Sequence, residues 1–283
     1  MKTFTRILAL ALLLGTAATS LAAGKITVKG SDTMVVLAQK WAEVYMSKHP
    51  GTEIQVTGGG TGTGFAALQN QTTDLCNASR KIKPKEKETC VKAFGKVPKE
   101  YEVCLDGLAV YVHADSPVKS LSLAQIQGIF TGKITNWKEV GGPEARISLY
   151  SRENSSGTYE FFKEHVLEGK DFAAAAQTMP GTASVLQAVA KDKLGIGYGG
   201  IAYAAGSKPL AVMKDAASPA IEPTEANVLN GSYPIWRHLY IYVNPALDKG
   251  ELAAYLNWLR SDDGQRVVKD VGYYPLPADK RAK

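Results

Sequence analysis

Residues 151–158 read Ser-Arg-Glu-Asn-Ser-Ser-Gly-Thr, and they join a strand-like run at residues 147–150 to a helix-like run at residues 159–167. The same order of strand, glycine-hydroxyl turn and helix recurs around residues 30–33 (Gly-Ser-Asp-Thr) and residues 58–64 (Gly-Gly-Gly-Thr-Gly-Thr-Gly). Alternation of strands and helices is typical of an α/β fold. These three turns therefore indicate the fold class and mark the ends of three strands.

The three turns also have the composition of an anion-binding site. A helix N-terminus presents unpaired backbone N–H groups and a partial positive charge. Glycine lets an anion approach the backbone closely, and Ser or Thr adds a hydroxyl donor. One such turn is usually only a helix cap, but three in one chain, with Arg80 and Arg152 available, predict a site for a small oxyanion. The turns follow strands, and ligands of open α/β sheets bind at the carboxyl ends of strands.

The order of elements predicts two lobes. A long apolar run at residues 102–112 continues into a region with its own strands and helices, and a further strand at residues 238–243 returns the chain. We expect residues 23–112 and 239–283 to form lobe 1, with residues 113–238 as lobe 2. The connections near residues 112 and 238 would then act as a hinge.

The first 22 residues have the pattern of a secretory signal peptide. Lys2 and Arg6 precede a short apolar run at residues 7–14, and small residues lead to a cleavage site near Ala22. No segment of the chain approaches the roughly 18–20 apolar residues that a membrane-spanning helix needs. We therefore expect a protein exported to the periplasm.

Composition and motif spacing argue against several other classes of protein. The net charge of +6 is spread along the chain, so no nucleic-acid-binding patch is predicted. The four histidines show no metal-ligand spacing, and the glycine cluster lacks the Gly-Lys-Ser/Thr ending of a P-loop. Residues 62–67 fit the dinucleotide pattern, but export argues against that cofactor. We expect no metal, no cofactor and no catalytic residue.

Three cysteines, Cys76, Cys90 and Cys104, leave the disulfide pattern open. An oxidising compartment allows two of them to pair, and Cys90 with Cys104 is the preferred pair because it closes a loop over one helix. The equal spacings do not resemble a zinc site. Sequence alone does not fix the connectivity, and one thiol would be left over.

Taken together, the motifs resemble the periplasmic phosphate-binding proteins of ABC transporters. Residues 151–158, followed by Phe161-Phe162, are similar to the phosphate-binding signature of that family. Residues 30–33 are similar to its first phosphate loop, residues 78–80 to the end of its third strand, and residues 130–137 to a turn of its second domain. The likeness covers essentially all of the chain after residue 22, in order.

The resemblance implies a two-lobed type II periplasmic binding fold, with a hinge and a central anion cleft. It implies a monomeric, non-enzymatic protein that binds inorganic phosphate and delivers it to an ABC permease in the inner membrane. The phosphate-binding residues implied by the resemblance are Ser31, Asp32, Thr33, Thr61, Arg80, Arg152, Ser156, Gly157 and Thr158.

Two positions depart from the family pattern. Some members have an Asp where this chain has Arg80, and that carboxylate accepts the proton of phosphate and so rejects sulfate. Asp32 either replaces this acceptor or only caps its helix. Asn154 stands where an acidic residue often orients the arginine, which predicts weaker support for Arg152. A binding protein for sulfate or molybdate, a sensory role, and a secreted phosphatase on the same fold are the alternatives.

Overall fold

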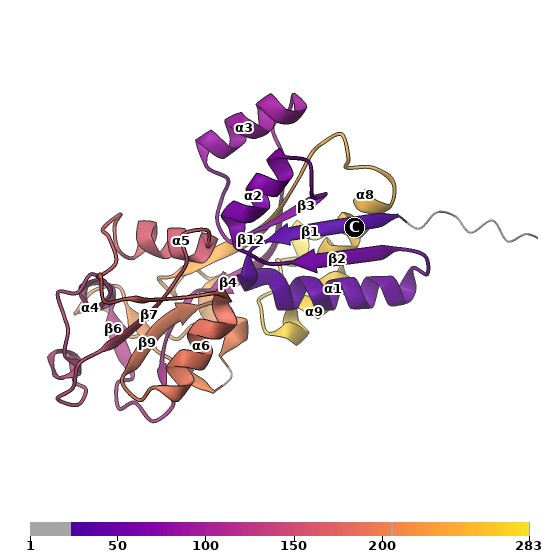
Figure 1. Cartoon of the computed structure of the whole chain (residues 1–283). Helices are drawn as coiled ribbons and strands as arrows, with labels where there is room; N and C mark the ends of the chain where they lie inside the picture. The colour runs from indigo at the N-terminus through magenta and orange to yellow at the C-terminus, as the bar shows by residue number, and fades with distance from the viewer. Residues whose placement is uncertain (1–23, 205, 283) are drawn as a thin grey trace, which may run out of the picture.

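The computed structural model describes residues 24–204 and 206–282, so the expected signal peptide lies outside the described residues. Figure 1 shows two lobes, each with a sheet and its own helices, joined where β4 and β12 run side by side. No helix in the described part of the chain is long and apolar enough to cross a membrane. The predicted α/β class and two-lobed arrangement are confirmed.

The sheet of the first lobe has the strand order β2-β1-β3-β12-β4. β1 pairs in parallel with β2 and β3, whereas β12 is antiparallel to β3 and β4. The strands are β1 (Lys25–Gly30), β2 (Glu53–Thr57), β3 (Leu75–Ala78), β4 (Lys99–Gly107) and β12 (Trp236–Val243). The helices are α1 (Val35–Lys48), α2 (Thr61–Gln69), α3 (Pro84–Phe94), α8 (Gly250–Arg260) and α9 (Asp262–Val271).

The first lobe's core holds α1, α8 and α9 against the sheet. The spacing that predicts an amphipathic helix places Trp41 and Tyr45 on the buried face of α1, where they pack with Leu256 of α8 and Val268 of α9. Burial of one such side chain contributes roughly 1.5–3 kcal/mol. This packing fixes α1 relative to β1, and hence fixes the turn that joins them.

The sheet of the second lobe has the strand order β10-β5-β9-β7-β8, with a small pair formed by β6 and β11. Its strands are β5 (Ala109–His113), β6 (Ser120–Ser122), β7 (Ser148–Arg152), β8 (Gln177–Met179), β9 (Gly195–Gly199), β10 (Ser207–Pro209) and β11 (Ala211–Met213). Its helices are α4 (Leu123–Phe130), α5 (Gly157–His165), α6 (Gly181–Lys191) and α7 (Glu225–Leu229). Phe162 of α5 stacks on Tyr198 of β9 at 4.0 Å between ring centroids, which anchors α5 to the sheet.

The chain crosses between the lobes at two adjacent points. β4 ends at Gly107 and β5 begins at Ala109, so the first crossing lies at Leu108. The return leads into β12, and the Tyr233 hydroxyl before it donates to the Leu108 carbonyl over 3.0 Å. Residues 109–112 therefore belong to the second sheet and residues 236–238 to the first, a shift of a few residues from the expected boundaries. Asp106-Gly107 interrupts the apolar run at residues 102–112 just before the crossing, and the expected boundaries did not take this interruption into account.

The three cysteines are free and buried, so the preferred Cys90–Cys104 disulfide is wrong. Cys90 packs in a cluster with Cys76 beneath α2 and α3, whereas Cys104 packs with the core below α1, α8 and α9. The two side chains thus lie in different layers of the lobe. Burial raises the pKa of the Cys90 thiol to about 11, and it raises those of Cys76 and Cys104 well above their ordinary value.

Candidate anion-binding site

Each of the three predicted turns begins a helix, as expected. Ser31 follows β1 and precedes a single 3-10 turn, Asp32–Met34, that leads into α1. Gly60 follows β2 and precedes α2, and Ser156 follows β7 and precedes α5. The first two turns belong to the first lobe and the third belongs to the second.

The turns of the two lobes contact each other through their backbones. Gly62 donates its N–H to the Ser155 carbonyl over 2.9 Å. A Cβ at Gly60, where φ is +92°, would lie 2.5 Å from that carbonyl oxygen, and a Cβ at Gly157 would lie 2.3 Å from Thr61 Oγ1. Glycine at both positions is therefore what allows the lobes to approach this closely.

A chain of threonine hydroxyls runs between two buried arginines. Arg152 Nη1 donates to Thr182 Oγ1 over 2.7 Å, and Thr182 Oγ1 lies 3.3 Å from Thr33 Oγ1. Thr33 Oγ1 lies 2.7 Å from Thr158 Oγ1, which accepts from Arg237 Nη2 over 3.0 Å. Thr33 belongs to the first lobe, while Thr158 and Thr182 begin helices of the second. This chain of hydroxyls thus links the two lobes by hydrogen bonds.

Further hydroxyls extend this chain on the first-lobe side. Ser79 donates its N–H to Thr61 Oγ1 over 3.1 Å, and its own Oγ lies 3.4 Å from Thr158 Oγ1. Ser156 caps α5, because its Oγ accepts from the N–H groups of Thr158 and Tyr159 at 3.2 Å. Hydroxyls from all three predicted turns and from the end of β3 therefore meet.

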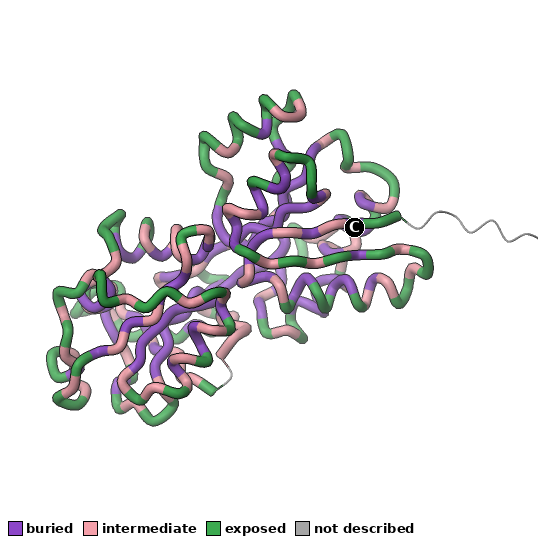
Figure 2. The backbone as a smooth tube through the Cα atoms, viewed as in Figure 1, coloured by how far each residue is buried: buried purple, intermediate pink, exposed green. Residues whose placement is uncertain are grey.

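The polar side chains of this cluster are withdrawn from solvent, in the purple zone where the lobes join in Figure 2. The hydroxyl and guanidinium side chains of the cluster that are exposed by 4% or less belong to Ser31, Thr33, Thr61, Ser79, Arg152, Ser156, Thr158, Thr182 and Arg237. Hydrogen bonds from such groups to a charged partner are stronger in a low-dielectric interior than in water. The cluster is rich in donors and holds two cationic heads, which suits it to an anion.

Two carboxylates orient the Arg152 guanidinium. Glu153 accepts from Nε over 3.0 Å and from Nη2 over 2.7 Å, while Asp32 accepts from Nη2 over 2.9 Å. Burial pushes the pKa of Glu153 upward, but the bonds from Arg152 outweigh burial and leave this pKa below its ordinary value. The support expected to be weak because of Asn154 is thus supplied by Glu153, one residue earlier.

Asp32 has a role that neither of the two sequence interpretations contains. Its Oδ1 accepts from the Gly59 N–H over 2.8 Å, and its Oδ2 accepts from Arg152. Its backbone carbonyl accepts from the Tyr203 hydroxyl over 2.8 Å. The capping position of the 3-10 turn is occupied by Ser31 instead. Asp32 therefore ties the glycine turn of its own lobe to the arginine of the other.

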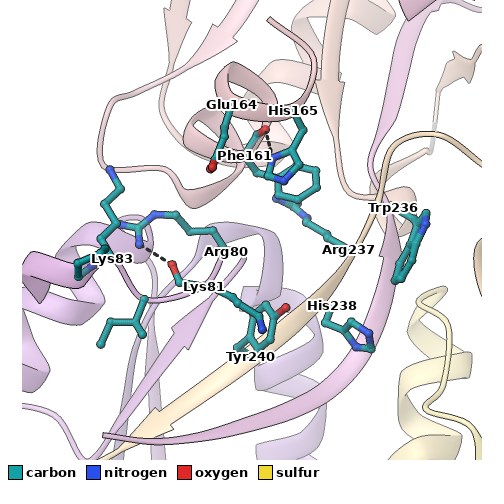
Figure 3. A pocket seen from close by; sticks show the side chains of 12 residues that line it. Arg80, Lys81, Lys83, Phe161, Glu164, His165, Trp236, Arg237, His238 and Tyr240 are labelled. Carbon is teal, nitrogen blue, oxygen red and sulfur yellow. Dashed lines mark hydrogen bonds between the residues drawn. The ribbon is translucent and has the colours of Figure 1, made fainter. Parts of the chain in front are cut away.

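Arg80 lies near the cluster but is engaged elsewhere. Its guanidinium binds both carboxylate oxygens of Glu86 at 2.7 and 2.8 Å and donates to the Lys81 carbonyl. It also lies over the Phe65 ring, 5.4 Å from the centroid. The side chain lines a cavity of about 450 Å³ between β12, α5 and the start of α3 (Figure 3). Its contacts hold the turn between β3 and α3.

Five residues of the cluster are not among the site residues predicted from the sequence: Ser79, Asp106, Glu153, Thr182 and Arg237. Thr182 follows Gly181 at the start of α6, so the glycine-hydroxyl pattern used for the other turns would have found it. Asp106 and Arg237 lie inside buried strands, and only the pairing of β4 with β12 brings them together. Within the described residues, no group of three or more His, Cys, Asp or Glu side chains is arranged to hold a metal ion.

Comparisons with known proteins agree with this architecture. A family model described as a PBP superfamily domain matches residues 15–263. The phosphate-binding protein PstS of Pseudomonas aeruginosa is 38% identical over 272 residues, covering 90% of this chain and 84% of the relative. PstS of Bacillus subtilis is 34% identical over 260 residues, covering 90% and 82%.

Solved structures show the same fold. A substrate-binding protein from Clostridium perfringens, assigned to phosphate ABC transport and crystallised with bound phosphate, superposes with a TM-score of 0.81 at 29% identity. The match covers 90% of this chain and 100% of that one. An ABC-type phosphate transport receptor from Vibrio cholerae gives a TM-score of 0.71 at 26% identity, covering 89% and 100%.

The fold and the interlobe cluster define a two-lobed binding protein of the periplasmic type. Within that class, this chain belongs to the family of phosphate-binding proteins of ABC transporters. That family consists of transport receptors and not of enzymes.

Proposed function

We propose that this protein captures inorganic phosphate between its two lobes, outside the cytoplasmic membrane, and delivers it to an ABC permease. The observation that carries the proposal is the buried cluster of hydroxyls between Arg152 and Arg237, to which both lobes contribute. The names of the relatives and the phosphate-bound structural neighbour support phosphate as the anion. The pattern of residues 1–22 supports export.

Capture would proceed by closure of the lobes about the two crossings. In the open form the first lobe presents Ser31, Thr33 and Thr61, and the second presents Arg152 with the Ser156-to-Thr158 start of α5. Closure brings these donors around the anion and removes them from water. Hydrogen bonds to charged groups contribute roughly 1.5–3 kcal/mol each, so a few of them reach the roughly 8 kcal/mol of micromolar binding.

Asp32 and Arg80 have supporting parts in this proposal. Asp32 positions Arg152 and the glycine turn, since both of its carboxylate oxygens already accept hydrogen bonds. Arg80 is neutralised by Glu86 and stabilises the turn that carries Ser79. The protein works as a monomer, and it binds phosphate without hydrolysing an ester. A chromogenic phosphate ester should therefore release no product in its presence.

A second oxyanion is favoured by one observation. Asp32 and Asp106, the carboxylates beside the hydroxyls, are each paired with an arginine. A free acceptor for the phosphate proton is what rejects sulfate, because two facing acceptors leave a buried group unpaired. We therefore expect weaker discrimination against sulfate than a free carboxylate would give.

Calorimetric titration of the mature, anion-stripped protein tests the proposal, with phosphate, sulfate and molybdate as separate titrants. One-to-one binding of phosphate at micromolar or lower concentration is the expected result. Binding of sulfate or molybdate alone would keep the site but overturn phosphate as the ligand. No heat with any of the three would reduce the turns to ordinary helix caps.

A further inference from the structure

Arg237 separates the hydroxyl cluster from the cavity of Figure 3. Its side chain leaves β12 and runs beneath α5, where the guanidinium carbon lies 5.2 Å from the centroid of the Phe161 ring. On the other side, Nη2 reaches Thr158 Oγ1 at 3.0 Å and Nη1 reaches the Ser79 carbonyl at 2.8 Å. The residue is 4% exposed. Its charged head is therefore directed at the cluster and not at solvent.

Strand pairing fixes this head in place. Arg237 on β12 lies opposite Asp106 on β4, so the two side chains are cross-strand neighbours. Asp106 Oδ2 accepts from Nε over 3.0 Å and from Nη2 over 2.8 Å, and Asp106 is fully buried. A buried ion pair is often no more stabilising than apolar residues of the same size. Stability alone is therefore a weak reason for such a pair at this position.

The pair also contacts the second lobe at two points. Arg237 donates to Thr158 at the start of α5, and Asp106 Oδ1 accepts from the Ile201 N–H over 3.0 Å. Ile201 follows β9 of the second sheet. Both members of a first-lobe ion pair thus bond to the lobe that moves on closure.

The bond to Thr158 determines how that hydroxyl uses its proton. A guanidinium has only donors, whereas a hydroxyl has one proton and two acceptor positions. Thr158 Oγ1 must therefore accept from Arg237, which leaves its own proton for Thr33, for Ser79 or for a ligand. Arg152 has the same effect on Thr182 at the other end of the chain. Each end hydroxyl consequently keeps its proton to donate within the cluster, which makes both of them available as donors to an anion.

We propose that Arg237, held by Asp106, is a positioning residue of the anion site that fixes the Thr158 hydroxyl as a donor to the bound oxyanion. The inference rests on the proposed function and adds a second arginine to it. Arg80 is the contrasting case, because a bidentate pair with Glu86 turns its guanidinium toward α3. The positive charge that the first lobe directs at the site is therefore that of Arg237 on β12, and not that of Arg80 after β3.

A mutant cycle on phosphate affinity tests this role. Replacing Arg237 alone would leave Asp106 charged and unpaired, so the two are changed together as Asp106→Asn with Arg237→Gln. Thr158→Val removes the hydroxyl and leaves the ion pair intact. We expect each of these two variants to weaken phosphate binding by about 10- to 100-fold, the effect of losing one hydrogen bond to a charged group. The triple variant should be little weaker than either one.

Non-additivity separates positioning from a general structural effect. If the pair only supported the fold, the fold-losses of phosphate affinity in the double variant and in Thr158→Val would multiply in the triple variant. That result would overturn the proposal. Unchanged affinity in the Asp106→Asn/Arg237→Gln variant would overturn it as well. Unfolding midpoints without phosphate identify variants that fail to fold.

Arg237→Lys provides a second route should the double variant not fold. An ammonium keeps the charge beside Asp106 but lacks the planar fork that reaches Asp106, Ser79 and Thr158 together. We expect it to bind phosphate at least about 10-fold more weakly; wild-type affinity would count against the proposal. If the wild-type protein binds sulfate instead of phosphate, the same cycle is measured with sulfate. If it binds none of the tested anions, the proposed function and this inference fall together.

Discussion

The two arginines at the ends of the hydroxyl chain differ in where their carboxylate partners lie. Arg152 is a second-lobe residue, and its partner Asp32 belongs to the first lobe and has a side chain 18% exposed. Arg237 and Asp106 lie on adjacent strands of one sheet, with side chains 2% and 0% exposed. In the proposed closure the first pair forms between the lobes, whereas the second pair lies within the sheet of the first lobe. Closure would thus add an ion pair at one end while the pair at the other end is already formed.

This difference predicts different consequences when each pair is broken. A pair made on closure should matter for ligand binding and little for folding of the open protein. A pair buried within one sheet should matter for folding first.

Asp106→Asn should lower the free energy of unfolding by about 3–5 kcal/mol, because it leaves the Arg237 guanidinium buried without a counter-charge. Urea denaturation of the phosphate-free protein measures this change. Asp32→Asn is the matched variant at the other end and should cost less than about 1 kcal/mol, since Glu153 still pairs with Arg152. Equal losses in both variants would contradict the comparison.

Arg152→Ala should weaken phosphate binding by at least about 100-fold, because it removes more than one charge-assisted hydrogen bond at the closing end. Isothermal titration measures the affinity. Arg146→Ala changes an exposed arginine in the same lobe and should leave the affinity unchanged. Submicromolar affinity retained in the Arg152→Ala protein would refute the assigned role.

Gly157→Ala should weaken binding by about 10-fold or more by opposing closure. The added Cβ would lie 2.3 Å from Thr61 Oγ1 and 2.7 Å from Ser79 Oγ, both in the other lobe, so opening relieves the clash. Gly62→Ala is the control, because the nearest atom to its Cβ, the Ser155 carbonyl oxygen, lies 3.4 Å away. The open protein should unfold at the wild-type midpoint. A clearly lowered unfolding midpoint of the phosphate-free variant would mean that the substitution disturbs the fold and does not merely block closure.

Glu153→Gln should have the smallest effect, and the effect should depend on pH. The pKa of the Glu153 carboxyl is lowered in the folded protein, so its stabilising contribution is present above the ordinary value of 4.5 and is lost as the pH falls through the lowered pKa. We expect the wild-type protein to be slightly more stable than the variant at pH 7 and the two to converge below pH 4.5. Thermal unfolding across this range measures the difference. A gap that stayed constant to the lowest pH would contradict the pairing.

Local patterns predicted most elements of the fold because each rests on short-range chemistry. Helix α1 follows from its apolar spacing, which places Trp41 and Tyr45 on one buried face. The start of α2 is less clear from the local pattern, because Gly62 and Gly64 interrupt the spacing typical of a helix. In the structure α2 begins at Thr61, and this gives Thr61 its place in the cluster.

The positions of Arg80 and Arg237 could not be obtained in the same way. Arg80 follows a strand near a predicted turn, which makes it a reasonable ligand by sequence, yet Glu86, six residues further on in the first turn of α3, binds its guanidinium. Arg237 lies in a strand with no turn or glycine beside it, 79 residues from Thr158. Its role depends on which strand lies next to β12, and that is a property of the whole sheet.

The alternation of strands and helices and the three glycine-hydroxyl turns follow from local sequence, because backbone conformation and helix-end chemistry act over a few neighbouring residues. The points where the chain crosses between lobes, the arginines that face the hydroxyls and the separation of Cys90 from Cys104 follow only from the tertiary structure. Those features depend on strand register and on the packing of one lobe against the other. They bring together residues more than 100 positions apart, such as Thr33 and Thr158, whose contact no local pattern encodes.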